Sequence, residues 1–266
     1  MSDPATQVAR EATSKPAFRA LARAGFAANG VVHVLLGAIV LAVAFGARGD
    51  ADQSGAFRAI ATAPLGFVVL WVIAAALIAL ALWRVAEGIL VRGGDLSDWG
   101  ARASAWGQAA VFVALGVVSA AVGLGARPNA DRTAEDTSRG VLQIPGGVFV
   151  LAAVGVGFVG AGIGFAVAGM LRTYRKKMTL PRSGIGRVVD VLGIAGYIGK
   201  GAALGIVGVL LVVAAVKGDA DAAGGLDGAV DGLIQMPFGP FLAALVGVGL
   251  IAYGVFTAIR SRYADL

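Results

Sequence analysis

Gly25-Phe26-Ala27-Ala28-Asn29-Gly30 opens a long apolar run early in the chain, and Gly196-Tyr197-Ile198-Gly199-Lys200-Gly201 opens another far along it. A second marker starts further apolar runs at three places: Pro64-Leu65-Gly66, Pro145-Gly146-Gly147 and Pro237-Phe238-Gly239. Internal repeats constrain architecture more than any other sequence signal. The chain is therefore read as one unit written three times, with two apolar segments in each copy.

The composition requires a lipid environment. The chain is 58% hydrophobic and 14% charged, whereas soluble domains carry about 25% charged residues. A membrane span needs about 20 mainly apolar residues, and six segments qualify. They are Ala24–Ala47, Ala59–Trp83, Ala103–Ala126, Gly140–Leu171, Val191–Val216 and Gly232–Ile259.

The predicted fold is an all-α polytopic membrane protein whose six transmembrane helices form three parallel helical-hairpin repeats in a pseudo-threefold bundle. All repeats enter from the same side, so they are related by an axis along the membrane normal. The Pro-x-Gly marker is expected to place its proline at the first position of a helix. The predicted divisions are a disordered cytoplasmic tail at 1–17, repeat one at 18–92, repeat two at 101–178 and repeat three at 187–263.

Charge sets the expected orientation. One set of flanks carries fourteen Lys and Arg residues and the opposite loops carry six, which predicts that both termini are cytoplasmic. We therefore expect a multi-pass protein of the bacterial plasma membrane. Anionic lipid headgroups are the expected partner at the cytoplasmic face. A nucleic-acid interface along the basic run 172–187 is the less favoured alternative, and no nucleic-acid partner is expected.

Glycine is unusually frequent, with 41 residues. Small residues let transmembrane helices approach closely, since lipid removes the hydrophobic drive between them. The predicted packing positions are Gly157, Gly160 and Gly164 in the fourth span and Gly201 and Gly205 in the fifth. A flexible gate helix is the alternative interpretation.

A few polar residues lie at membrane depth, where they are functional hypotheses. Aligning the first helices of the repeats superposes Asn29, Gln108 and Lys200, and His33 lies one turn from Asn29 on the same face. In a closed ring these side chains would converge on the axis as a polar path. The alternative is structural: amides that join helices, and a lysine that reaches the headgroups.

Near the end of the second span, Arg84 and Glu87 are spaced for a local ion pair, with a Glu87–Lys200 pair as the alternative. The acidic loops, with Asp50, Asp52 and Asp219 among them, are expected to be solvated. The chain has no cysteine and one histidine, which excludes thiolate and multi-histidine metal sites. Since no nucleophile–base set or cofactor motif is visible, we expect no enzyme activity and no cofactor.

Three stretches carry a resemblance: 22–32 opening the first helix, Ala81-Leu82-Trp83-Arg84-Val85-Ala86-Glu87 closing the second, and 236–242 with Ala252-Tyr253-Gly254 in the sixth. On these the chain resembles, from Phe18 to Tyr263, a bacterial membrane family called domain of unknown function 1206. Its members carry tandem two-helix units, commonly three, and are frequent in actinobacteria. Repeat two departs from the pattern at 104–108. The resemblance implies fold and membrane location and supplies no activity.

Two functions remain open at this point. The first is a structural or accessory membrane subunit that packs with partner proteins, lipids or another copy of itself. The alternative is a small transporter or channel with a polar path along the pseudo-threefold axis. The two differ in whether Asn29, Gln108 and Lys200 face one common cavity.

Overall fold

The structure, a computed structural model, describes residues 4–47, 49–91, 93–178 and 184–264. Within these ranges the chain is helical, with one isolated bridge between Met178 and Ala264. Six helices among the described residues are long and apolar enough to cross a membrane, which confirms the predicted fold class and makes this a multi-pass membrane protein. They are α2 (Pro16–Ala44), α4 (Gly66–Leu90), α5 (Leu96–Gly123), α7 (Gly147–Met170), α8 (Gly184–Lys217) and α10 (Gly239–Tyr263).

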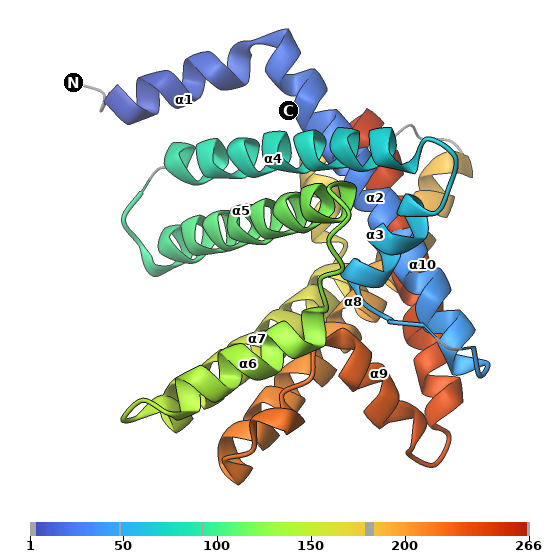
Figure 1. Cartoon of the computed structure of the whole chain (residues 1–266). Helices are drawn as coiled ribbons and strands as arrows, with labels where there is room; N and C mark the ends of the chain where they lie inside the picture. The colour runs from blue at the N-terminus through green and yellow to red at the C-terminus, as the bar shows by residue number, and fades with distance from the viewer. Residues whose placement is uncertain (1–3, 48, 92, 179–183, 265–266) are drawn as a thin grey trace.

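Short helices connect the two spans of each repeat (Figure 1). They are α3 (Gln53–Ala61), α6 (Ala130–Leu142) and α9 (Leu226–Ile234), with the 3₁₀ turn η2 (Ala220–Ala222) before α9. The end of the bundle that carries them is called the loop end below. The opposite end, where α2 begins and α10 ends, is called the terminal end, and it also carries the 3₁₀ turn η1 (Thr173–Lys177).

The prediction that the N-terminal tail is disordered is wrong for the residues that the structure describes. Residues Pro4–Ser14 form α1, which contacts α4 and buries Ala9. The segment lacks a long apolar run, but a short helix can be held by contact with a neighbour; here Ala9 is buried while Val8 stays 68% exposed. Only residues 1–3 of the predicted tail lie outside the described residues.

The Pro-x-Gly marker starts each even-numbered span, but the proline lies two residues before the helix. The middle residue is a left-handed N-cap in all three copies, Leu65, Gly146 and Phe238. The following glycine then opens the helix against a carbonyl of the preceding short helix. A Cβ on Gly147 would lie 1.7 Å from the carbonyl oxygen of Val141, so only glycine fits there.

The strongest helix contacts join neighbouring repeats. The second span of each repeat pairs with the first span of the next: α4 with α5, α7 with α8, and α10 back with α2. The three pairs are visible side by side in Figure 1. Because α10 returns to α2, repeat three contacts repeat one, which gives the pseudo-threefold relation a physical basis.

The same small-residue interface occurs in all three pairs. In each second span, the residues 10 and 17 positions after the Pro-x-Gly proline face two residues of the partner span in the next repeat. Those two residues are also seven positions apart. In the α2–α10 pair, a Cβ on Gly30 would lie 2.7 Å from the Gly254 carbonyl oxygen, and one on Gly37 would lie 2.6 Å from that of Gly247. The corresponding sets are Gly155 and Gly162 with Gly208 and Gly201 in α7–α8, and Ala74 and Ala81 with Gly116 and Ala109 in α4–α5.

The prediction that Gly157, Gly160 and Gly164 pack against a neighbouring helix is wrong within the chain. All three are exposed, and a Cβ built on any of them meets nothing within 4 Å. Gly162, on another face of α7, makes the close contact instead. Of the other predicted glycines, Gly201 lies in reciprocal contact with Gly162, and the backbone of Gly205 lines the same contact.

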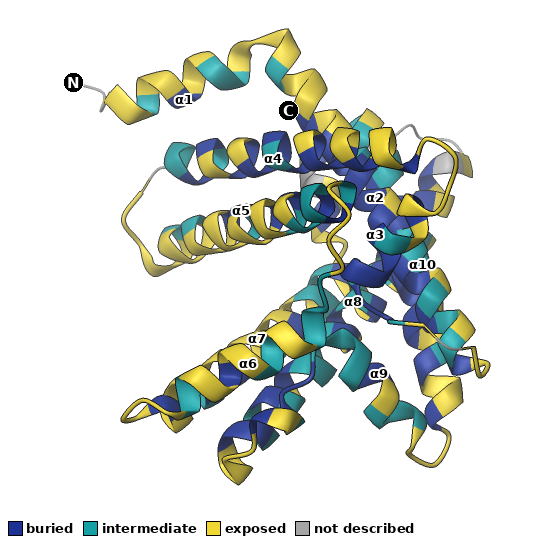
Figure 2. Ribbon diagram, in the orientation of Figure 1, coloured by how far each residue is buried: buried dark blue, intermediate teal, exposed yellow. Residues whose placement is uncertain are grey.

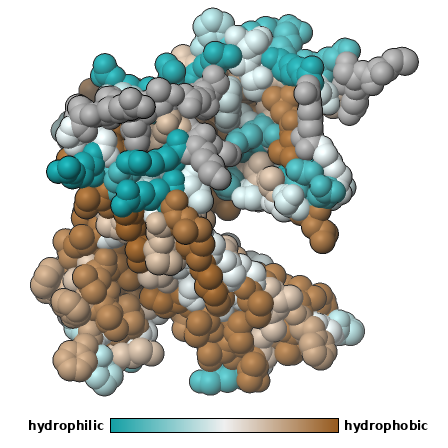
Figure 3. All heavy atoms as spheres, turned by 180° about the vertical axis from the view of Figure 1, so that it is seen from behind, coloured by the Kyte–Doolittle hydropathy of each residue, from teal (hydrophilic) through white to brown (hydrophobic). Residues whose placement is uncertain are grey.

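Repeat two breaks the symmetry. In repeat one α2 contacts α4, and in repeat three α8 contacts α10, whereas α5 and α7 make no comparable contact. The α4/α5 and α7/α8 pairs diverge in Figure 1, and Figure 3 shows the surface hollowed on that side. Only 17% of the most apolar window of α7 is buried, against 56% in α2, α4 and α10, and exposed residues run along α5 and α7 in Figure 2. One side of the bundle is therefore open.

Candidate functional site

The polar residues predicted at membrane depth lie in the half of the bundle toward the terminal end, and part of them meet. Tyr253 of α10 stands between two of them. Its ring centroid lies 4.9 Å from that of His33 and 4.3 Å from Lys200 Nζ. The same ammonium lies 5.1 Å from the Phe165 centroid of α7. Lys200 is thus held between two aromatic faces, a geometry that attracts a cation.

His33 and Asn29 are both buried on α2. His33 Nδ1 lies 2.8 Å from the carbonyl oxygen of Asn29. Because that oxygen can only accept, Nδ1 carries the proton and donates it. The Asn29 side-chain oxygen Oδ1 is buried with no partner among the described groups. This amide therefore keeps an acceptor available inside the protein.

A second layer of charge surrounds Phe26. Arg84 is 6% exposed, and its Nη1 lies 2.5 Å from Glu87 Oε2, so the predicted local ion pair is present. The guanidinium of Arg84 lies 5.4 Å from the Phe26 centroid, and that of Arg260 from α10 lies 4.9 Å from the same ring. The Nε atoms of both arginines are buried without a hydrogen-bond partner in the described chain.

Gln108 does not join this group. Its Nε2 donates to Ser104 Oγ, 3.1 Å away on the same helix, in an exposed setting. The predicted convergence of Asn29, Gln108 and Lys200 is therefore wrong at Gln108. The physical reason is the open side of repeat two: α5 rests on α4 and makes no comparable contact with α2 or α8.

The sequence did not predict the aromatic and basic residues that surround the polar group at membrane depth. Tyr253, Phe165, Phe26 and Arg260 complete it, and Tyr197 links it to an aromatic cluster at the terminal end, 5.6 Å from Tyr253 between ring centroids. A signal for them existed. Counting from the Pro-x-Gly prolines superposes Arg84 on Phe165, and Glu87 on Arg260.

The three cations form one electrostatic unit. Lys200, Arg260 and Arg84 all act electrostatically on Tyr253, and Glu87 is paired with Arg84. A cluster with more cations than carboxylates, with aromatic walls and unpaired buried donors, is suited to hold an anion. In the part of the chain that the structure describes, no group of three His, Cys, Asp or Glu residues is placed to hold a metal ion.

At the loop end, three aspartates accept hydrogen bonds from backbone amides of the neighbouring repeats and so form a ring of contacts, called the aspartate ring below. Asp52 Oδ2 accepts from the Ala130 amide at 3.3 Å, and Asp131 Oδ2 accepts from the Gly228 amide at 2.8 Å. Asp227 Oδ1 then accepts from the amide of Ala51 in repeat one at 2.6 Å. Each repeat thus holds the next, and the third holds the first.

This aspartate ring corrects the expectation of solvated acidic loops. Asp52 is only 2% exposed and also caps α3 through the Gly55 amide, 2.6 Å from its Oδ1. Partial burial raises the pKa of Asp131 and of Asp227, and the neighbouring carboxylates raise both further, while the backbone amides lower them. The ring therefore joins the repeats, and the negative charges of Asp131 and Asp227 disfavour the folded state at neutral pH.

The three repeats are also what known sequences share with this chain. The family described as Domain of Unknown Function (DUF1206) matches residues 24–90, 103–172 and 195–264. The chain belongs to this family. Each matched segment contains a first span or most of it, a short loop-end helix and a second span, so the family unit is the structural repeat seen here.

A related protein matches this chain over nearly its whole length. The chain is 27% identical over 260 residues to a protein of Bacillus subtilis (strain 168) described as "Uncharacterized protein YxxB", covering 95% of this chain and 94% of the relative. No solved structure matches the chain significantly. The family match supports the three-repeat architecture, and neither description names an activity.

Proposed function

We propose that this chain is a non-enzymatic accessory protein of the bacterial plasma membrane, which packs laterally against a transmembrane helix of another protein at the open side of repeat two. The observation that supports the proposal is that α5 and α7 lack a contact comparable to those between the two spans of the other repeats. The corresponding helices touch in the other two repeats, so the side is left open by this chain alone and a further helix would complete it.

The surface of α7 fits such an occupant. Gly157, Gly160 and Gly164 are exposed and offer no side chain to hold a partner away. Small residues at this spacing allow close approach of helix backbones in lipid. The same principle operates inside this chain on the other face of α7, where Gly155 and Gly162 meet α8.

Site-specific photocrosslinking tests the proposal in living cells. A photoreactive amino acid at Val156, beside this glycine face, should give a protein adduct on illumination. The control is Val72 on α4, because both valines are 62% exposed. No adduct at Val156, or equal adducts at both sites, would contradict the proposal. An adduct consisting of two copies of this chain would replace the accessory role with self-association.

The cytoplasmic location of both termini is part of the proposal and rests on the charge bias of the flanks. The absence of cysteine makes labelling direct. An impermeant maleimide should label Thr137→Cys, exposed on α6, in intact cells. Ser97→Cys, exposed at the start of α5, should react only after permeabilisation, and the reverse pattern would invert the topology.

A second candidate function is transport or binding of a small anion, favoured by the cluster of Lys200, Arg84 and Arg260. Buried guanidinium groups with free donors are an expensive arrangement in a membrane, and an anion between them would offset that cost. Flux of a halide into proteoliposomes that contain the purified protein tests this candidate. Flux equal to that of protein-free liposomes would remove it.

A further inference from the structure

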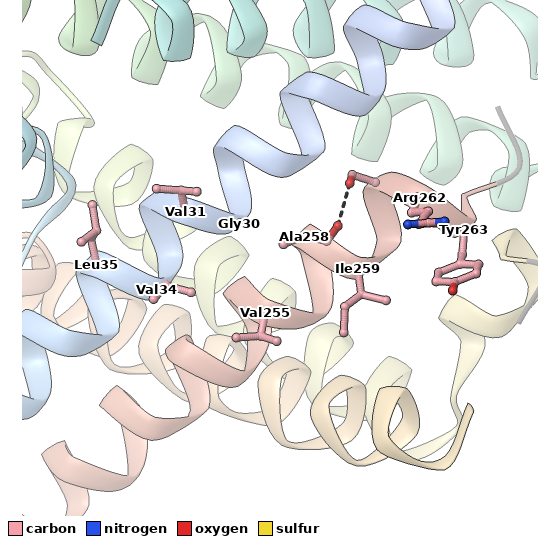
Figure 4. A pocket seen from close by; sticks show the side chains of 10 residues that line it. Gly30, Val31, Val34, Leu35, Val255, Ala258, Ile259, Arg262 and Tyr263 are labelled. Atoms are coloured by element: carbon pink, nitrogen blue, oxygen red, sulfur yellow. Dashed lines mark hydrogen bonds between the residues drawn. The ribbon is translucent and has the colours of Figure 1, made fainter. Parts of the chain in front are cut away.

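A groove lies between α2 and α10 on the surface of the bundle. It has a volume of about 560 Å³, and its floor includes Gly30 and Ala258, where side chains are absent or small. Its walls are apolar, with Val34 and Leu35 from α2 and Val255 and Ile259 among those from α10. Figure 4 shows the two helices diverging toward the end of α10 that carries Arg262 and Tyr263.

The groove changes character along its length. From Val255 to Ile259 its lining is apolar, and the backbone there is helical and satisfied internally. Ser261, Arg262 and Tyr263 line the terminal end. An occupant must therefore be apolar along the walls and polar at the mouth. The nine residues from Val255 to Tyr263 span about 12 Å along a helix, a length suited to part of an acyl chain.

The helix register places a second cation toward the same end, just outside the residues that line the groove. The Gly30–Gly254 and Gly37–Gly247 contacts fix the antiparallel register of α2 and α10. Continuing that register two turns toward the terminal end places Arg23 on the same face of α2 as Gly30, opposite Ser261. Arg23 and Arg262 are both exposed, and neither takes part in an ion pair found in the described ranges of the chain.

We propose that this groove is a binding site for an anionic phospholipid, with one acyl chain along the α2–α10 walls and the phosphate between Arg23 and Arg262. The apolar walls select a hydrocarbon chain. The pair of cations, with no carboxylate among the described residues that line the groove, selects a net negative headgroup over a zwitterionic one. The site is separate from the α5–α7 side and does not depend on a partner helix.

Native mass spectrometry of the delipidated protein with added phosphatidylglycerol or phosphatidylcholine tests the site. Phosphatidylglycerol should bind more tightly, and each of Arg23→Gln and Arg262→Gln should weaken it about fivefold, as expected for one cation near a phosphate surface. Val31→Trp, at an exposed position of the groove lining, should block binding of the lipid. Val72→Trp on α4 is the matched control and should leave binding unchanged.

The results separate the alternatives. Equal affinity for the two lipids, or arginine variants without effect, would overturn the headgroup assignment. Unchanged binding in Val31→Trp, or equal loss in Val72→Trp, would show that the lipid sits elsewhere on the bundle. Inorganic phosphate that displaces the lipid fully would show a headgroup site alone and would overturn the role of the groove. Thermal midpoints of the variants close to that of the unaltered protein ensure that each result reports on binding.

Discussion

Gly162 and Gly201 lie in reciprocal contact, so that a Cβ built on either residue would fall 2.5 Å from the carbonyl oxygen of the other. The contact joins α7 of repeat two to α8 of repeat three. Its counterpart between α10 and α2 joins Gly254 to Gly30, where the distances are 2.6 and 2.7 Å. Backbone-to-backbone packing at equivalent positions therefore joins repeat two to repeat three and repeat three to repeat one.

Gly162→Leu should destabilise the protein strongly, since the new side chain must displace the backbone of α8. Overpacking of this kind costs about 1–3 kcal/mol or more. Gly160→Leu should leave the thermal midpoint in detergent almost unchanged, because Gly160 meets nothing within 4 Å. Fluorescence-detected size exclusion after heating measures both variants. Similar losses in the two would show that another helix of the chain covers the Gly160 face.

The sequence of α7 alone does not show which of its two glycine faces packs against α8. The helix carries glycine on several faces, and the GxxxG pair of Gly160 and Gly164 is the more familiar motif. What decides the packing face is the match to Gly201 and Gly208, which are seven residues apart as Gly155 and Gly162 are. That match appears when the second spans are aligned on the Pro-x-Gly marker and the first spans are aligned at Asn29, Gln108 and Lys200. The repeats and spans were predictable because they rest on long patterns, whereas a packing face depends on the neighbouring helix.

Leu65→Gly should stabilise the protein by about 1 kcal/mol, because left-handed backbone is unfavourable for a residue with a Cβ. Leu65 has φ of 60° and its side chain is 77% exposed, so little packing is lost. Repeat two already has glycine at this place, Gly146 with φ of 79°. Gly146→Leu should lower the thermal midpoint by a similar amount, and opposite signs in the two variants are the measured signature.

The aspartate ring should make the protein more stable on mild acidification. The pKa of Asp131 is raised in the folded state, so the folded protein binds this proton more tightly than the unfolded chain. The resulting stability is full below the ordinary pKa and is lost as pH rises through the folded pKa. Thermal unfolding followed from pH 7 downward should therefore show a rising midpoint.

Asp131→Asn should raise the midpoint at pH 7 and flatten this dependence, because the amide oxygen can still accept from Gly228 without a charge. Thr137→Ala, at an exposed position of the same helix, is the control and should keep the slope of the unaltered protein. A midpoint that falls on acidification in the unaltered protein, or a slope unchanged by Asp131→Asn, would contradict the assigned sign.

The members of this ring show a second limit of sequence reasoning. Aligning the similar loop segments 48–52, 127–131 and 217–221 superposes Asp221 on Asp52 and Asp131. In the structure η2 occupies that stretch, and Asp227 at the start of α9 takes the third place. Gln108 differs in the opposite way: the alignment was sound, but α5 leans away from the other repeats. Equivalent positions in sequence thus give equivalent contacts only where the helices meet in the same way.

Lys200→Met should leave stability unchanged or raise it. A cation over an aromatic ring gains about 0.5–2 kcal/mol, whereas an ionised lysine at membrane depth costs about 2.5–3.5 kcal/mol, so the fold does not need this charge. Methionine keeps the apolar length of the side chain and stays between Tyr253 and Phe165. Lys217→Met, at an exposed lysine where α8 ends, is the control for loss of a charge alone.

The outcome also weighs the two candidate functions. Thermal midpoints and halide flux would be measured on the same preparations. A stable Lys200→Met variant that loses flux seen in the unaltered protein would make this lysine a functional residue and favour the anion site. A midpoint that falls by the equivalent of about 2 kcal/mol, the upper end of a cation–aromatic contact, would show instead that the aromatic cage exists to hold the helices. That result would leave lateral packing as the better supported function.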